Sequence, residues 1–596
     1  MPWTYDAPLK DMRFVIERVL NAPHSWAACD AFADVDIDTV AAILEEGNRF
    51  AREVLLPTNA VGDHEGCTRD VEGNVRTPTG FVATYKAFVE GGWPALPCDP
   101  EYGGQGLPLL VDAAVREMLM ACNHAWEMYP DLLHGAIETL RAHGSVQLKA
   151  DYLPKLVSGE WLAAMSLTEP QAGSDLGLLR TKAAPQADGS VRVSGDKCFI
   201  SGGDHDLTDN LVHLVLCRLP DAPAGSKGVS LALVPKFLSD GTRNTWRCEG
   251  LEHKMGIHGS ATCVLHYEGA TGWLVGQPNK GLAAMFVMMN SARMHVGLQG
   301  LAAQEVAAQN AVTYAHERVQ MRAAVRPISA GQVPADAIAH HPAMRHALLG
   351  LQARIEAQRV IAYRAAQLID DAEHHPEATT RERAGRLAAL LTPIVKAYCT
   401  HQGFHGASAA LQVFGGYGFI AEYGIEQCVR DARIAMIYEG TNEIQAIDLV
   451  QRKVLADRGA TLELLFAELD AEVTKAQAEP GIADLARGLA EAVAAARAGT
   501  KALDDRAQRS LSGADLEAVL MVADDYLLGL SHTLLAWAFC ASARAALNHE
   551  DAARAEGKMA RMRYGMQWVV PAGSVHWDRV RQGDLHLPKA SALSRA

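Results

Sequence analysis

The 596-residue sequence has few features of a secreted, metal-binding or nucleic-acid-binding protein. Its eleven cysteines are an odd number and none forms a C-x-x-C pair, which argues against a disulfide framework and a zinc site. The formal net charge of −15 at pH 7 argues against general nucleic-acid binding. The sequence starts without a basic region followed by an apolar core. We therefore expect a cytoplasmic protein.

The sequence also lacks several catalytic signatures. It contains no H-E-x-x-H, no Walker-type phosphate loop and no G-x-S-x-G, which excludes the usual zinc proteases, P-loop enzymes and α/β-hydrolases. His253 and His258 have no cysteine or carboxylate partner at metal-ligand spacing, so we predict no metal site. Residues 416–421 match G-x-G-x-x-A, but they follow an alanine-rich helical pattern instead of a strand. A Rossmann dinucleotide fingerprint is therefore excluded.

The remaining composition is that of a globular protein with several domains. Hydrophobic residues make up 49% and charged residues 21% of the chain. Residues 526–543 form the most apolar long stretch, but they include Ser531, His532 and Thr533 and are short for a bilayer span. We expect a buried helix there and no transmembrane segment.

The hydrophobic pattern changes period along the chain and predicts a mainly α protein with a central antiparallel β domain. Two β-rich runs flank Asp188-Gly189, a turn sequence that predicts a hairpin. We expect the tail after Pro571 to be irregular. We predict an N-terminal lead-in (1–36), an N-terminal helical domain (37–160) and the central β domain (161–275). A helical bundle (276–455) and an additional C-terminal helical domain with its tail (456–596) follow.

One short stretch, 437–445, places the carboxylate of Glu439 directly before a predicted amphipathic helix. Asn442 and Gln445 are a capping pair by spacing, and Thr441 is the neighbouring alternative. Exposed N–H groups at such a loop-to-helix junction can polarise a nearby carbonyl. An ordinary acidic residue favouring a helix N-terminus would explain Glu439 equally well, so this stretch alone does not assign a function.

Together, its motifs make the sequence resemble the acyl-CoA dehydrogenase flavoprotein family. The resemblance spans about residues 37 to 455, and the additional C-terminal region resembles that of the long forms of the family. In chain order, the motifs that carry it are Leu167-Thr-Glu-Pro-x-Ala-Gly-Ser-Asp175, Lys197–Ser201, Arg318 in Tyr-Ala-His-Glu-Arg, Gln412-Val-Phe-Gly-Gly-Tyr-Gly418, Arg430-Asp-Ala-Arg433 and Ile437-Tyr-Glu-Gly-Thr-x-Glu-Ile-Gln445.

The resemblance implies a reaction of fatty acid β-oxidation. The family removes a proton and a hydride from the α and β carbons of an acyl-CoA, leaving a trans-2-enoyl-CoA and reduced FAD. Glu439 matches the catalytic base, and its backbone N–H with a ribityl hydroxyl of FAD would polarise the thioester carbonyl. Some relatives carry the base just before the position of Arg293, but here that residue is Ala292.

The resemblance also implies the residues that bind FAD and substrate. Phe199 stands where most relatives have a tryptophan against the flavin, and Glu443 stands where many have glutamine, which leaves its role open. The implied contacts are Leu167, Thr168, Phe199 and Ser201 at the flavin ring, Arg318, Gln412, Gly415 and Gly416 at the FAD of a neighbouring subunit, Thr441 at the FAD of its own subunit, and Ser174, Arg293 and Gly440 at the substrate.

The implied partners are an electron-transferring flavoprotein and a second copy of the chain, since FAD bound across a subunit interface requires at least a dimer. We expect a homodimer. The substrate stays open between fatty acyl-CoA thioesters and 3-methylthiopropanoyl-CoA. Two alternatives share the scaffold: an acyl-CoA oxidase that uses oxygen, and a DNA-binding alkylation-response flavoprotein. The second rests on a mild excess of nine Lys and Arg over five Asp and Glu from Arg544 to Ala596.

Overall fold

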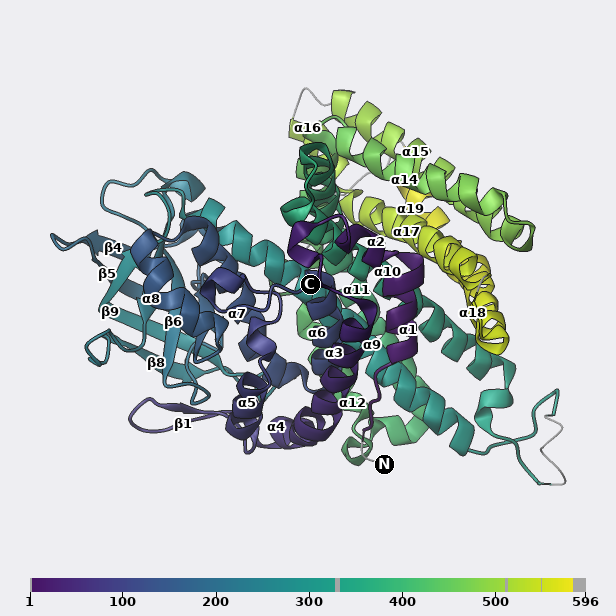
Figure 1. The fold of residues 1–596 in the computed structure, drawn as a ribbon, viewed down its shortest axis with the longest axis horizontal. Coiled ribbons are helices and arrows are strands. Elements are labelled where there is room, and N and C mark those ends of the chain that lie inside the picture. The colour runs from purple at the N-terminus through teal and green to yellow at the C-terminus, as the bar shows by residue number, and fades with distance from the viewer. Residues whose placement is uncertain (1–2, 327–332, 510–512, 548, 583–596) are drawn as a thin grey trace, which may run out of the picture. The chain divides into compact units, whose positions relative to one another are not determined.

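The computed structural model describes residues 3–326, 333–509, 513–547 and 549–582, which form helices and one main sheet (Figure 1). The chain divides into two compact units, each assembled from separate segments. The first consists of Met1–Ala7, Asp38–Ala302 and Ala421–Ile434, and the second of Pro8–Ile37, Ala303–Ile420 and Ala435–Ala596.

The first unit contains a seven-stranded sheet with strand order β3-β6-β7-β9-β5-β4, and β8 pairs with β9. The strands are β3 Trp161–Ser166, β4 Lys182–Pro185, β5 Val191–Ser201, β6 Asn210–Cys217, β7 Ser230–Pro235, β8 Trp246–Leu251 and β9 Thr262–Leu274. The predicted hairpin is confirmed, because β4 and β5 pair antiparallel around a turn with Gly189 at φ +85°.

The prediction of a purely antiparallel domain was wrong in one respect. β3 and β6 are parallel, with Trp161 opposite Asn210 and Ser166 opposite Val215. The chain between them contains β4 and β5, and this long connection lets β6 return beside β3 in the same direction. The sheet is therefore mixed.

Helices of the first unit lie over one face of this sheet, where α7 and α8 pack against β3 (Figure 1). A short hairpin of β1 and β2, Thr68–Arg69 and Val75–Arg76, interrupts the helices and was not predicted. The helices are α3 Ile37–Phe50, α4 Asn59–Glu65, α5 Phe81–Glu90, α6 Leu109–Cys122, α7 His124–His143, α8 Val146–Val157 and α12 Ile425–Arg433, together with the first part of α9 Gly281–Glu317.

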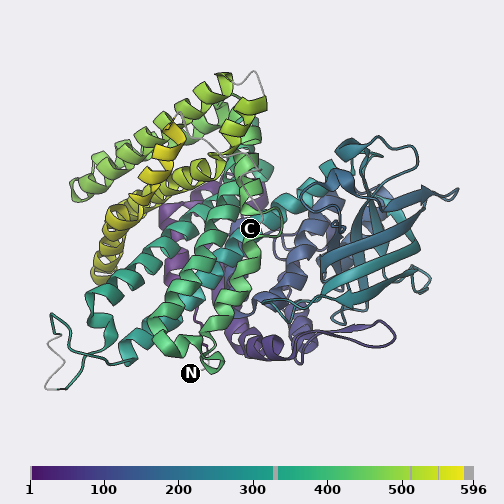
Figure 2. The same cartoon turned by 180° about the vertical axis from the view of Figure 1, so that it is seen from behind.

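The second unit is helical in its described residues (Figure 2). The motif stretch at Glu439 immediately precedes α13 Asn442–Asp448, and a π-helical segment, Leu449–Leu455, continues it. The other helices are α1 Leu9–Phe14, α2 Ala22–Trp26, the rest of α9, α10 Pro342–His374, α11 Ala378–Phe414, α14 Ala460–Gln477, α15 Ala483–Arg509, α16 Gly513–Leu520, α17 Ala523–Ala546, α18 Ala552–Tyr564 and α19 Ala572–Arg581.

Helix α17 is the central apolar helix of the additional domain. The segment Leu516–Ala546 is long and apolar enough to cross a membrane, but 89% of its most apolar window is buried inside the protein. The hydroxyls of Ser531 and Thr533 donate to the carbonyls of Leu527 and Gly529 one turn earlier, at 2.8 and 3.1 Å. α17 packs against α10, α13, α15 and α19, so it joins the additional domain to the helical bundle.

The expectation of an irregular tail after Pro571 was wrong as far as Arg581, because these residues form α19. The reason is tertiary packing around Trp577, which is only 2% exposed. Glycines let two helices approach this indole: an added Cβ would lie 2.3 Å from it at Gly499 of α15 and 2.7 Å from it at Gly529 of α17. Residues 583–596 lie outside the described part of the tail.

We predict that Trp577→Ala lowers the free energy of unfolding of the second unit by about 3–5 kcal/mol, because a large cavity opens between three helices. Trp568→Ala is the matched control, since Trp568 is 62% exposed, and should cost about 0.5 kcal/mol or less. Thermal and denaturant unfolding of the two variants measure the difference. Equal losses would show that α19 does not contribute to the core.

Candidate active site

The stretch before α13 forms a tight turn with two successive residues in the left-handed region. Glu439 has φ +57° and Gly440 has φ +86°. Glycine adopts this conformation freely, but a glutamate does so only when its surroundings hold it there. Such a conformation at a non-glycine residue is a frequent mark of a functional site.

Side chains from two helices fix this turn through its carbonyl groups. Gln445 of α13 reaches back and donates from Nε2 to the carbonyls of Glu439 and Gly440, at 3.1 and 3.3 Å. Lys396 of α11 donates from Nζ to the carbonyl of Gly440 at 2.8 Å. Both side chains are completely buried, so water does not compete for these hydrogen bonds.

The predicted cap of α13 was assigned to the wrong pair. Thr441 is the N-cap, and its hydroxyl accepts from the N–H of Ile444 at 3.4 Å. Asn442 instead bonds to α11, donating from Nδ2 to the carbonyl of Ala397 at 3.1 Å. A tertiary contact thus recruits Asn442, and Gln445 bonds the carbonyls of the turn, which leaves the alternative, Thr441, as the cap.

The two carboxylates of this stretch have different surroundings. The Oε2 atom of Glu439 is buried, whereas the side chain of Glu443 is exposed. Burial and the negative charge of Glu443 raise the pKa of Asp524 on α17. Glu443 therefore lies near an acidic residue of the additional domain.

In the first unit, the ends of β3 and β5 bring the predicted flavin contacts together. The N–H of Cys198 donates to the carbonyl of Thr168 at 3.0 Å. The pairing of β5 with β9 is irregular between Lys197 and Ile200, and Phe199 within this bulge has φ +58°. The residue is 62% exposed. The backbone bond from Cys198 to Thr168 brings this part of β5 next to the loop that follows β3, so an exposed aromatic residue and the hydroxyl-bearing Thr168 and Ser201 belong to one region, which fits a flat heteroaromatic ligand.

A buried ion pair holds these strand ends in place. Lys197 is fully buried, and its Nζ donates to Glu169 Oε1 at 3.0 Å and to the carbonyl of Leu167 at 2.7 Å. Glu169 also accepts from the N–H groups of Arg180 and Thr181, at 2.6 and 2.9 Å. Burial alone would raise the pKa of Glu169, but Lys197 and these N–H donors lower it to about 2.

Another cluster of predicted cofactor residues lies where α9 and α11 end in the second unit. The Tyr314 and Phe414 rings stack at 4.3 Å, and the Arg318 guanidinium lies 5.5 Å from the centre of the Tyr417 ring. Within the described residues, no carboxylate forms an ion pair with Arg318. The neighbouring Gln412, Gly415 and Gly416 are exposed. An added Cβ at Gly415 or Gly416 would meet no atom within 4 Å. The guanidinium of Arg318 beside this open backbone suits a phosphate-bearing group.

The predicted substrate contacts have contrasting environments. Ser174 is exposed in the loop after β3. Arg293 is only 6% exposed, and its guanidinium lies 5.9 Å from the centre of the ring of Phe286, which precedes it by about two turns of α9. Ala292 beside it is buried. The structure thus groups Leu167, Thr168, Phe199 and Ser201 in the first unit, and Glu439, Gly440 and Thr441 in the second.

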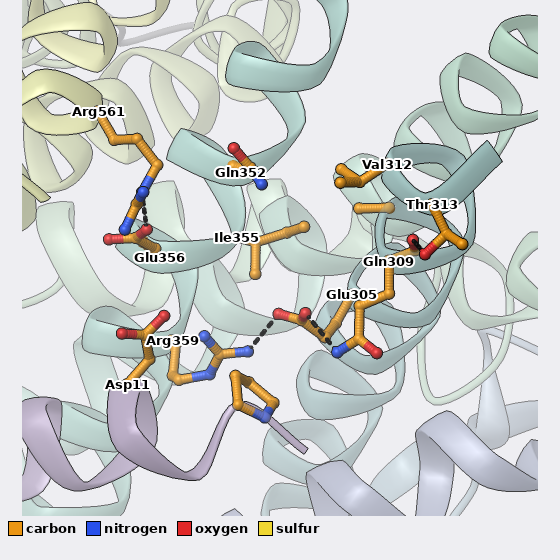
Figure 3. A pocket seen from close by; sticks show the side chains of 12 residues that line it. Asp11, Glu305, Gln309, Val312, Thr313, Gln352, Ile355, Glu356, Arg359 and Arg561 are labelled. Atoms are coloured by element: carbon orange, nitrogen blue, oxygen red, sulfur yellow. Dashed lines mark hydrogen bonds and ion pairs between the residues drawn. The ribbon is translucent and has the colours of Figure 1, made fainter. Parts of the chain in front are cut away.

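A cavity of about 430 Å³ in the second unit contains none of the predicted site residues (Figure 3). Its charged side chains have partners: Arg359 pairs with Glu305 and Arg561 with Glu356 (Figure 3), and Asp11 pairs with Arg554. The charges that line the cavity are therefore compensated by ion pairs, and we assign it no role in the reaction.

Models of acyl-CoA dehydrogenase domains match consecutive parts of the chain. The N-terminal domain matches residues 37–160, the middle domain 164–270 and the C-terminal domain 279–455. A further model, described as acetyl-CoA dehydrogenase C-terminal like, matches residues 465–590. The chain belongs to the acyl-CoA dehydrogenase family, and it is an oxidoreductase with FAD as its cofactor.

Individual relatives agree with this assignment. The chain is 44% identical over 503 residues to 3-methylmercaptopropionyl-CoA dehydrogenase of Ruegeria pomeroyi, and the match covers 83% of this chain and 84% of that protein. It is 36% identical over 471 residues to the broad-specificity linear acyl-CoA dehydrogenase FadE5 of Mycobacterium tuberculosis, covering 77% and 76%. A solved acyl-CoA dehydrogenase complexed with FAD from Bacillus anthracis has the same fold, with TM-score 0.73, 21% identity and coverage of 97% and 92%.

Sequence reasoning missed the residues that hold the site in shape. Lys197 and Glu169 lie inside recognised motifs, but nothing in the sequence marks them as partners. Lys396 lies outside the motifs. Its signal is a single cation in an apolar helical run, Ile394-Val395-Lys396-Ala397-Tyr398, where a charge needs a specific partner.

We predict that Glu169→Gln destabilises the first unit by about 3–5 kcal/mol, because it leaves the ammonium of Lys197 buried without its counter-charge. The variant should also retain less FAD after gel filtration, since the strand ends at Thr168 and Phe199 loosen. Glu268→Gln is the control: this glutamate forms an ion pair with Arg247, and its side chain is 73% exposed, so the loss should be about 0–1 kcal/mol.

The same prediction has a pH signature. The pKa of Glu169 is lowered from 4.5 to about 2 in the folded protein, so its stabilisation is complete above about pH 4.5 and disappears as the pH falls toward 2. The difference in stability between the native protein and Glu169→Gln should shrink over this range. A difference that does not depend on pH would contradict the ion-pair explanation.

Proposed function

We propose that the protein oxidises an acyl-CoA thioester to the trans-2-enoyl-CoA, with Glu439 as the base that takes the α-proton. The observation that carries this proposal is the turn at Glu439 and Gly440, in which a glutamate with one buried carboxylate oxygen is held in the left-handed region. FAD, when bound, supplies the acceptor for the hydride that leaves the β carbon. Leu167, Thr168, Phe199 and Ser201 would hold its ring.

The chemistry requires a well-placed carboxylate because an α-proton beside a thioester is only weakly acidic. Glu439 meets this need with a fixed backbone, so that little motion is required before proton transfer. When an acyl chain excludes water from the carboxylate, the anion loses hydration and becomes a stronger base. The backbone N–H of Glu439 would polarise the thioester carbonyl as negative charge develops on its oxygen.

The substrate that we propose is a short, linear acyl-CoA, with 3-methylthiopropanoyl-CoA first among those to test. This choice rests on the 44% identity to the Ruegeria pomeroyi protein, which extends over most of both chains. Ser174, Arg293 and Gly440 are the residues that we propose to line the substrate path. The match to a broad-specificity linear acyl-CoA dehydrogenase keeps longer chains as the alternative.

We propose that an electron-transferring flavoprotein reoxidises the cofactor and that the working form is a cytoplasmic homodimer. In the dimer, Arg318 with Gln412, Gly415 and Gly416 would contact the partner's FAD, where a cation offsets phosphate charge. The pairing of Arg318 with the exposed ring of Tyr417 supports this surface. Thr441 would contact the FAD of its own subunit.

The described cations on which the DNA-binding alternative rests form ion pairs within the second unit. Each Lys and Arg between Arg544 and Arg581 forms an ion pair with a carboxylate within the second unit; the acidic partners are Glu472, Asp11, Glu356, Asp484, Asp525 and Asp578. A DNA-binding surface requires cations that can reach phosphates. The described part of the additional domain uses these cations for internal contacts.

The base is tested with Glu439→Gln. We expect the variant to bind FAD as the native protein does and to lose at least about 10³-fold in turnover, because an amide cannot accept the α-proton. FAD content, turnover and exchange of the α-proton in D₂O should be measured together. A variant that retains most of its turnover would remove Glu439 from this role.

The substrate and the electron acceptor are tested with a panel of acyl-CoA thioesters of graded length that includes 3-methylthiopropanoyl-CoA. We expect the highest kcat/KM with this thioether or with a short linear chain, and rapid reduction of an electron-transferring flavoprotein. Oxygen uptake with stoichiometric peroxide would instead identify an acyl-CoA oxidase. Preference for long chains would overturn the proposed substrate and leave the reaction unchanged.

A further inference from the structure

We infer that Lys396 is a positioning residue for the reaction: it locks the turn that carries Glu439 and thereby sets the rate of α-proton transfer. The inference rests on the proposed function, because it assigns Lys396 a role through Glu439. Lys396 lies in the middle of α11, more than forty residues before the turn that it holds.

The burial of Lys396 shows that its charge serves a specific contact. Its side chain has no exposed surface, and transferring an ammonium group out of water is costly unless its hydrogen bonds are replaced. Nζ donates to the Gly440 carbonyl at 2.8 Å and to Asn442 Oδ1 at 3.0 Å. Both acceptors belong to the turn or to the first residue of α13.

Lys396 works with two neighbours on the same face of α11. The hydroxyl of Thr400, one turn later, donates to the carbonyl of Lys396 at 2.7 Å and lies 3.2 Å from Asn442 Oδ1. The carbonyl of Ala397 accepts from Asn442 Nδ2 at 3.1 Å. Positions four apart lie on one helix face, so α11 presents a polar cradle that binds both ends of the Asn442 amide and the Gly440 carbonyl.

This cradle determines the direction of the turn's peptide groups. In a trans peptide the N–H and C=O point in opposite directions. Because the Gly440 carbonyl points to Lys396, the N–H of Thr441 points away from α11. The Glu439 carbonyl is held by Gln445, so the N–H of Gly440 likewise points away from that side chain. Lys396 and Gln445 therefore fix both peptides that follow Glu439.

A fixed turn is needed because Glu439 must present its carboxylate at the α carbon of the thioester. Misplacing a reacting group by about 1 Å can cost roughly 10²-fold in rate. Without Lys396, the Gly440 carbonyl loses its charged donor, and a glycine at this position can relax to other conformations. The carboxylate would then sample non-productive positions while substrate and FAD still bind.

The test uses Lys396→Met and Lys396→Arg in the full-length holoenzyme. We expect Lys396→Met to lower kcat by roughly 10²-fold with KM and FAD content within about threefold of the native protein. An α-deuterated substrate should show a larger kinetic isotope effect on kcat, since proton transfer limits turnover more strongly. Lys396→Arg restores a cationic donor, so its kcat should be at least about tenfold higher than that of Lys396→Met.

Lys558→Met is the matched control, because Lys558 is a second buried lysine of the same unit, 2% exposed and paired with Glu356 at 2.8 Å. It should lower stability without changing kcat or the isotope effect. Equal effects of the two methionine variants on kcat, or an unchanged isotope effect in Lys396→Met, would reduce Lys396 to a structural role and overturn the inference.

A second variant keeps the test decisive if Lys396→Met does not fold. Gln445→Met removes the other donor to the same carbonyls and should lower kcat by at least about tenfold with an increased isotope effect. If Gln445→Met turns over normally, the inference fails. If Glu439→Gln remains active, the proposed base fails whatever Lys396 does. An inactive Glu439→Gln with fully active Lys396→Met would reject this inference alone.

Discussion

The hydrogen bonds from Lys396 and Gln445 to the carbonyls of Glu439 and Gly440 are the contacts on which the site in the second unit depends. A glutamate does not hold a left-handed conformation by itself, because its Cβ crowds the following carbonyl. Two fully buried donors offset that cost by satisfying the carbonyls of the turn. The long helix α11 and the short helix α13 thus act as a rigid support, and Glu439 is the side chain that they present.

The first unit has the same kind of contact at the residues that we propose for the flavin. Lys197 of β5 is buried between the carbonyl of Leu167 and the carboxylate of Glu169, and so it ties β5 to the loop that follows β3. A buried lysine needs both a counter-charge and carbonyl acceptors, and it fixes the backbone that supplies them. In each unit, a buried cation orders the backbone beside a residue that we propose for the site, Gly440 and Glu439 in the second unit and Leu167 and Thr168 in the first.

The additional domain is built into the second unit. Its central helix, α17, packs against α13, which directly follows the turn of Glu439. The charge of Glu443 acts on Asp524 of α17, and the Lys and Arg residues from Arg544 to Arg581 form ion pairs with carboxylates of the second unit. The domain therefore supports the helix behind the proposed base, and its composition alone gave no indication of this task.

The sequence by itself determined the family, the mainly α architecture with a central β domain, and FAD as the cofactor. It could do so because hydrophobic periodicity and short motifs are local properties of the chain. It also led to Glu439 as the proposed base, through the motif around Gly440 and the alanine at position 292. The parallel pairing of β3 with β6 and the helix α19 around Trp577 were outside its reach, and the sequence offered Thr441 as a cap only as the alternative to Asn442. Each depends on residues distant in the chain: the return of β6, two glycines on other helices, and α11, which binds Asn442. Only the tertiary structure brings Lys396 to Gly440, because a buried charge is assigned its partner by packing and not by sequence spacing.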